Sequence, residues 1–100
     1  MAVVVQLRWD GVTPDLYEKT REIVQWETDI PDGAIFHVAW FDQGGINVVD
    51  VWEAPEQFQA FVERRLTPAT KQAGIQGEPR VDFQPAHRNF DAQHGTARAG

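Results

Sequence analysis

Hydrophobic and polar positions alternate over residues 2–9, which is the period of a β-strand with one buried face. Asp10 and the glycine after it end this strand. A helix is predicted to follow, because Thr13 is a favourable N-cap and Pro14 suits the first helical position. Apolar residues then recur at helical spacing to about residue 27, opposite a charged side. This pattern predicts a surface helix that packs over a sheet.

A β-hairpin is predicted in the middle of the chain. Residues 30–33, Ile-Pro-Asp-Gly, are a strong break, and alternating segments follow at about 34–41 and 46–53. Residues 42–45, Asp-Gln-Gly-Gly, supply the positive φ values that a tight hairpin turn needs. The two segments are therefore expected to be adjacent antiparallel strands.

A second helix and a last strand complete the pattern. Pro55 starts the helix, and its apolar stripe continues to about residue 69. Pro68 should kink or restart this helix, because proline lacks the amide donor and clashes with the preceding turn. Gly74 is a suitable stop. The last strand is expected at about residues 79–86.

The predicted order βαββαβ gives two βαβ units with right-handed crossovers. They form a four-stranded antiparallel sheet with two helices on one face, the ferredoxin-like α+β fold. We assign residues 1–87 to this single domain and residues 88–100, which are polar and unpatterned, to a mobile C-terminal tail. The second sheet face is left uncovered, and its apolar residues predict a homodimer that packs sheet on sheet.

Composition then narrows the classes of function. The net charge of −6 argues against a nucleic-acid partner and against an anionic membrane surface. The absence of cysteine excludes thiol chemistry, and the absence of serine excludes a serine nucleophile. No segment has the pattern of a signal peptide or of a transmembrane helix, so a cytoplasmic protein is expected. Four tryptophans and six phenylalanines predict an aromatic core or an apolar ligand cleft.

A histidine and an aspartate are predicted to meet across the hairpin. A two-residue or four-residue loop pairs His37 with Asp50, and the same register pairs Ile35 with Trp52. Directly paired side chains share one face of the sheet, with Cβ atoms about 5 Å apart. A carboxylate fixes the tautomer of the imidazole that it holds, as a general base requires. His37 and Asp50 are therefore the candidate catalytic pair, while Trp40 falls on the opposite face.

Several alternatives stay open at this point. A three-residue loop would place Val38 opposite Asp50 and would separate the pair. Even in contact, a buried Asp–His pair can serve structure alone. A metal site built from this pair and His87 lacks the spacing of known metal motifs, so no metal is expected. Trp9 and Trp26 are expected to pack at the ends of elements.

Residues 51–58, Val-Trp-Glu-Ala-Pro-Glu-Gln-Phe, follow a Gly-Gly hairpin and precede a long helix. This junction resembles the dimeric α/β-barrel superfamily, which includes antibiotic-biosynthesis-type and haem-degrading monooxygenases, and the likeness in layout covers residues 2–87. It implies that Trp52 projects into a pocket between sheet and helices. The haem-degrading branch also needs a histidine on the second helix and an asparagine on the first strand. The second helix has no histidine and the first strand offers only Gln6 or Arg8, so no haem and no other cofactor is expected.

The favoured function is binding of, or action on, a hydrophobic small molecule by a homodimer. As an enzyme, the protein would carry out cofactor-independent oxygenation, as the resemblance implies, with His37 deprotonating the substrate and Asp50 orienting the base. Cyclase or isomerase chemistry would use the same base. A non-catalytic ligand-binding or stress-associated dimer, and a protein whose dimer is itself the product, are the alternatives. The residues expected to line the pocket are Trp52, Tyr17, Ile35, Phe58 and Val62.

Overall fold

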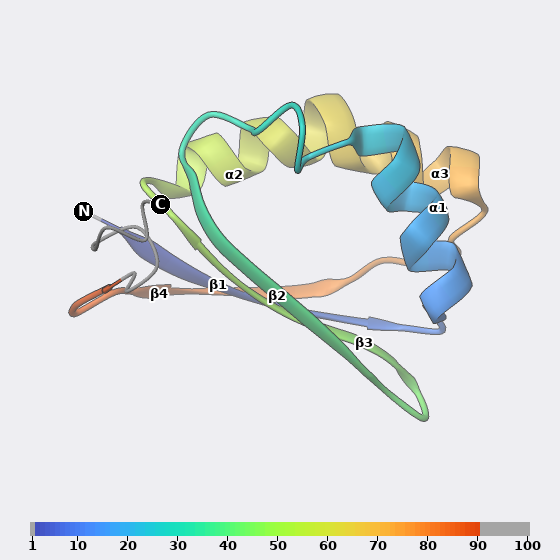
Figure 1. The fold of residues 1–100 in the computed structure, drawn as a ribbon. Coiled ribbons are helices and arrows are strands. Elements are labelled where there is room, and N and C mark those ends of the chain that lie inside the picture. The colour runs from blue at the N-terminus through green and yellow to red at the C-terminus, as the bar shows by residue number, and fades with distance from the viewer. Residues whose placement is uncertain (1, 91–100) are drawn as a thin grey trace, which may run out of the picture.

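A computed structural model describes residues 2–90 of the chain (Figure 1). Its elements are β1 (Val3–Asp10), α1 (Pro14–Val24), β2 (Ala34–Asp42), β3 (Gly45–Trp52), α2 (Pro55–Phe61), the π-helix η1 (Val62–Leu66), α3 (Thr67–Ala73) and β4 (Arg80–Pro85). The antiparallel sheet has the strand order β2-β3-β1-β4, and the helices lie over one of its faces. The predicted ferredoxin-like α+β fold is confirmed. Of the tail predicted at 88–100, residues 91–100 lie outside the described part.

Both ends of α1 are explained by local chemistry. The Thr13 side chain accepts a hydrogen bond from the Leu16 amide at 3.3 Å, so the predicted N-cap is confirmed. The helix ends at Val24, because Gln25 adopts a left-handed conformation with φ 59°. The Gln25 amide donates to the Arg21 carbonyl, and the chain turns away from the helix axis.

The second helical run restarts near Pro68, as predicted. A π-helical turn, η1, separates α2 from α3, and the Thr67 amide donates to the carbonyl of Val62, five residues back. Pro68 has no amide to donate, and the wider turn before it accommodates its ring. The same turn carries Arg65, whose role in the site is described below.

The hairpin register is confirmed with one correction. A two-residue loop joins Asp42 to Gly45, and His37 pairs with Asp50. The prediction that Ile35 lies opposite Trp52 was wrong, since a β-bulge between residues 34 and 36 shifts the pairing there. The tryptophan pairs with Ala34 instead.

The core occupies two clusters between the sheet and the helices. One contains Val5, Trp52 and Phe58, and the other contains Ile46 and Val48. The helices approach the sheet backbone mainly where α2 meets β3, so side chains and open space fill the rest of this layer. No helix in the described range is long and apolar enough to cross a membrane.

The opposite sheet face is apolar over β2. Phe36, Val38 and Trp40 follow one another at two-residue spacing on this strand, and each remains 40–54% exposed, although Phe36 also borders the cavity between the sheet and the helices. Trp40 was predicted to lie on this face, and its exposure agrees with that prediction. We call these three residues and their cross-strand neighbours, Val49 and Val51, the open sheet face.

Candidate active site

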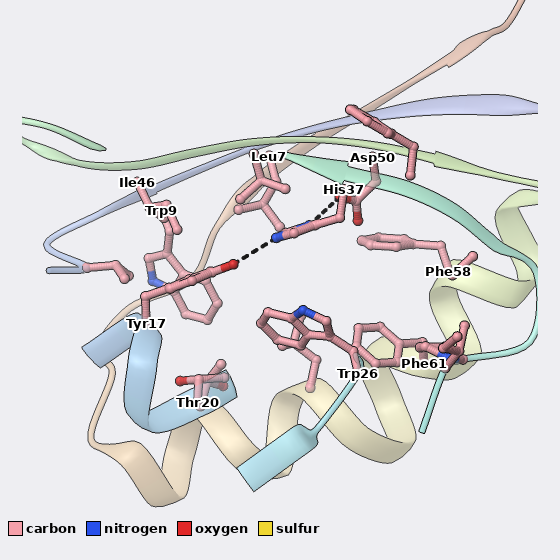
Figure 2. Close-up of a pocket in the computed structure, with 18 of the residues that line it drawn as sticks. Leu7, Trp9, Tyr17, Thr20, Trp26, His37, Ile46, Asp50, Phe58 and Phe61 are labelled. Atoms are coloured by element: carbon pink, nitrogen blue, oxygen red, sulfur yellow. Dashed lines mark hydrogen bonds and ion pairs between the residues drawn. The ribbon is translucent and has the colours of Figure 1, made fainter. Parts of the chain in front are cut away.

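A cavity of about 420 Å³ lies between the helices and the sheet, and we call it the His37 cavity (Figure 2). Its size is within the range of small-molecule sites, and most of its walls are apolar or aromatic. Apolar side chains reach it from the sheet, from the helices and from the loop after α3. They include Leu7, Ile46, Val48, Phe58, Phe61, Leu66 and Ile75.

A chain of hydrogen bonds runs along one wall of this cavity. The Tyr17 hydroxyl lies 2.9 Å from Nε2 of His37, and Nδ1 of His37 lies 2.7 Å from Oδ1 of Asp50. The other carboxylate oxygen, Oδ2, accepts from Nε1 of Trp52 at 3.1 Å. One helix and two strands therefore contribute to one network: α1 supplies the phenol, β2 the imidazole, and β3 the carboxylate and indole.

The donors and acceptors in this chain follow from its chemistry. A carboxylate only accepts hydrogen bonds, so the His37 proton resides on Nδ1 and points at Asp50. The Nε2 atom of the neutral ring then carries a lone pair, and it accepts from the Tyr17 hydroxyl. The structure thus presents a base whose lone pair is directed at a phenol.

The residues of this network become more exposed from the core toward the cavity. Asp50 is 8% exposed and is held on both oxygens, whereas the His37 side chain is 33% exposed. Burial also raises the pKa of Tyr17 to about 12, so its hydroxyl stays neutral at physiological pH. The carboxylate is therefore fixed, and the imidazole and phenol are the groups that a ligand can reach.

Trp26 belongs to the site, although it was predicted to pack at the end of an element. Its ring centroid lies 5.3 Å from that of His37 and 5.7 Å from that of Tyr17. It comes from the loop after α1, which ends at Val24 and not near residue 27 as the helical spacing predicted, so the periodicity misplaced it. Figure 2 shows its indole facing the histidine from the helix side of the cavity.

Arg65 ties down the loop that carries Trp26. Its Nη2 atom donates to the carbonyl of Val24 at 2.8 Å and to that of Asp29 at 2.8 Å. These two carbonyls flank the loop on either side of the indole. The guanidinium of Arg65, a residue of η1, therefore holds the two ends of the loop together.

The residues predicted to line the pocket divide into two groups. Tyr17, Ile35 and Phe58 line the His37 cavity. Trp52 does not, because it is 3% exposed and packs behind Phe58 at a centroid distance of 5.5 Å. Val62 faces a neighbouring cavity instead. Trp52 thus supports the wall and holds the carboxylate of the network.

Two further expectations concern Trp9 and a metal. Trp9 lies at the end of β1 and lines the cavity, and its Nε1 atom donates to the Gln76 carbonyl at 2.9 Å. His87 is exposed and does not line the His37 cavity. Within residues 2–90, no three histidine, aspartate or glutamate side chains gather as metal ligands.

Comparison with known proteins identifies relatives of the fold. No protein-family model matches the sequence, and no curated protein matches it. The cofactor-independent oxygenase SnoaB from Streptomyces nogalater has a TM-score of 0.60 and 13% identity over 89% of this chain and 95% of its own. Rv0793 from Mycobacterium tuberculosis has a TM-score of 0.59 and 15% identity over 91% of this chain and 100% of its own.

A protein from Deinococcus radiodurans, assigned as an antibiotic biosynthesis monooxygenase, has a TM-score of 0.56 and 14% identity over 91% of this chain and 97% of its own. At these identities the likeness concerns the fold. It confirms the predicted resemblance in fold to antibiotic-biosynthesis-monooxygenase-like proteins.

Proposed function

We propose that this protein binds a hydrophobic aromatic small molecule in the His37 cavity and that His37 removes a proton from an acidic hydroxyl or enol of that ligand. The observation that carries this proposal is the Tyr17–His37–Asp50 chain in the wall of an apolar cavity. Such a cavity binds the body of an aromatic ligand, and the few polar groups orient it.

The resting network suggests how the ligand is selected. Tyr17 occupies the Nε2 lone pair of His37, so a ligand hydroxyl must displace it. The more acidic a ligand hydroxyl is, the more strongly it donates to this atom. The displaced phenol can then donate to the oxyanion that forms on the ligand. Phenols and enols can therefore compete with the Tyr17 hydroxyl for Nε2, whereas the much less acidic aliphatic alcohols cannot.

We further propose cofactor-independent oxygenation as the reaction, with dioxygen as the second substrate. The fold shared with the oxygenase SnoaB and with an assigned antibiotic biosynthesis monooxygenase supports this choice. Deprotonation makes the ligand electron-rich, and a methylene carbon between two rings can then reduce dioxygen. The balance is R2CH2 + O2 → R2CO + H2O, in which the carbon supplies all four electrons.

Anthrone tests this proposal, because it is tricyclic, has an acidic enol form and gives anthraquinone and water by this balance. Under 18O2 we expect one labelled oxygen atom in the product, measured by mass spectrometry. His37→Ala should lower the rate about 10²- to 10⁴-fold, the usual contribution of a general base. His87→Ala is the matched control, because His87 is exposed and away from the cavity. Equal rates in the two variants would refute the role of His37.

A non-catalytic ligand-binding dimer is the second candidate. The observation in its favour is that Tyr17 already satisfies His37, so the network is complete without a substrate. In that case anthrone and phenols would bind to the wild-type protein without oxygen uptake. An oxygen electrode and a binding titration on the same sample separate the two functions.

We propose that the open sheet face forms a homodimer. Phe36 and Trp40 are 54% and 49% exposed, and a contiguous apolar surface of this kind is typical of an interface. A second copy fits because the same face then covers itself about a two-fold axis. We expect a dimer in sedimentation velocity at micromolar concentration and a monomer for Trp40→Glu. Gln84→Glu, on the polar part of the same face, should stay dimeric, and a wild-type monomer would contradict the proposal.

A further inference from the structure

A second cavity, of about 700 Å³, lies beside the His37 cavity, and we call it the β4 cavity. It is bounded by η1 and α3 on one side and by β4 and the residues before it on the other. Val81 and Phe83 provide its floor, and Val62 lies on the helix side. Phe83 is 37% exposed, although it points to the side of the sheet that the helices cover.

The two cavities share one wall. Six residues line both of them: Leu7, Trp9, Phe58, Leu66, Thr70 and Ile75. All but the threonine are apolar or aromatic. No ion pair of the described residues crosses this wall. The surface that the two cavities share is therefore mostly apolar, and its polar groups are the Thr70 side chain and the Trp9 indole N–H, which donates to the Gln76 carbonyl.

The sheet provides a continuous floor beneath both cavities. Val48 on β3 pairs with Leu7 on β1, and Leu7 pairs with Val81 on β4. Val48 lines the His37 cavity, Val81 lines the β4 cavity, and Leu7 lines both. From β2, which carries His37, to β4 there are three strand spacings, or about 14 Å. A single aromatic ring does not span this distance.

We propose that the two cavities form one extended site for an amphiphilic aromatic ligand with an apolar tail. The acidic hydroxyl of the ring lies at His37, and the tail passes Leu7 to rest on Val81 and Phe83 in the β4 cavity. This inference rests on the function proposed above and adds the class of substrate. Given carbon–carbon bonds of about 1.5 Å, a chain of about eight carbons reaches the far floor.

The outer rim of the β4 cavity fits this orientation. It carries polar and charged side chains of both signs, including Gln59, Glu63, Lys71, Gln76 and Glu78. A rim of mixed charge favours neither an anionic nor a cationic ligand end, whereas the floor favours an apolar one. The acidic end of the ligand therefore belongs at His37, where its hydroxyl can displace Tyr17 and donate to Nε2.

A series of para-alkylphenols, from ethyl to octyl, tests the proposal. Each added methylene that enters the β4 cavity should tighten binding about threefold to fourfold, measured by tryptophan fluorescence or calorimetry. Val81→Trp and Glu63→Trp fill the β4 cavity from the sheet side and from the exposed rim. Both should flatten the dependence of affinity on chain length. Asp82→Trp is the matched control, because it lies on the same strand but on the other sheet face.

Three outcomes decide the matter. A chain-length dependence that is lost in either cavity-filling variant and kept in Asp82→Trp supports the extended site. Binding of ethylphenol that requires His37, with no gain for longer chains, overturns the extended site and leaves the proposed function standing. If the wild-type protein binds none of the phenols, both the extended site and the proposed function are overturned. Should the variants fail to fold, magnetisation transfer in NMR between the terminal methyl of octylphenol and the Val81 methyls decides instead: its presence supports the proposal, and its absence in a saturated complex overturns it.

Discussion

Replacement of Asp50 by asparagine is expected to reverse the polarity of the hydrogen-bonded chain. The two carboxylate oxygens accept from Nδ1 of His37 and from Nε1 of Trp52. An amide has only one oxygen, so it can serve only one of these donors. The indole can act only as a donor, and it is buried, so it takes the amide oxygen. The amide nitrogen then faces Nδ1, and the proton of His37 moves to Nε2.

The expected cost in stability follows from these two bonds. A hydrogen bond to a charged group contributes about 1.5–3 kcal/mol, and a neutral one about 0.5–1.5 kcal/mol. Exchange of two charged bonds for two neutral ones should therefore lower the free energy of unfolding by about 2 kcal/mol. Asp50→Ala should cost more, about 3–5 kcal/mol, because it leaves the indole and imidazole donors unpaired. Urea unfolding at one fixed protein concentration measures both values.

The tautomer is the sharper readout. In the wild-type protein, ¹⁵N NMR of the imidazole should show the proton on Nδ1 of His37, and in Asp50→Asn it should show the proton on Nε2. The variant should also lose activity about 10²- to 10⁴-fold, since Nε2 no longer offers a lone pair. His87, which is exposed, should be unchanged and serves as the internal control. An unaltered tautomer, or a stability loss below about 0.5 kcal/mol, would refute the assignment of donors and acceptors.

Three further predictions concern pH and the loop. Tyr17 is the only tyrosine, and burial raises its pKa from 10.0 to about 12, so its titration in the ultraviolet spectrum should be displaced to higher pH. The free energy of unfolding should fall between these two pH values, because the tyrosine ionises at lower pH in the unfolded chain than in the folded one. A titration at 10.0 would contradict this. The Arg8 guanidinium holds the pKa of Asp42 well below its usual range, so Asp42→Asn should lessen the stability lost on acidification below about pH 4, and an identical acid profile would count against it. Arg65→Ala should lower the unfolding free energy by about 1–3 kcal/mol and weaken ligand binding, while exposed Arg64→Ala should do neither; equal effects would disprove the loop clamp.

Local signals in the sequence were sufficient to predict the fold. A threonine cap before a proline marks the start of α1, and a two-residue loop with a glycine at its end fixes the hairpin register. Because residues two apart share a face of a strand, this register alone brings His37 against Asp50 and turns Trp40 away. These inferences needed only short-range geometry, which the sequence encodes directly.

The parts of the site that the sequence did not predict depend on longer-range packing. The β-bulge that displaces Ile35 lies between Ala34 and Phe36 and contains no glycine, so its residues give no sequence signal for a bulge. Trp26 reaches the cavity through a left-handed turn at Gln25 and through the hold of Arg65, which is distant in sequence. Trp52 was placed on the correct face, but Phe58 covers it, and only the three-dimensional packing shows which of two aromatic residues meets the cavity.

The central claim is that His37 takes a proton from a ligand bound in the apolar cavity. Umbelliferone reports this directly, because its neutral and ionised forms absorb at different wavelengths. At a fixed pH below the pKa of free umbelliferone, binding to the wild-type protein should increase the ionised fraction of the ligand. Binding to His37→Ala should not increase it. An ionised fraction that stays at or below the value in free solution, or that rises equally in the variant, would contradict the account.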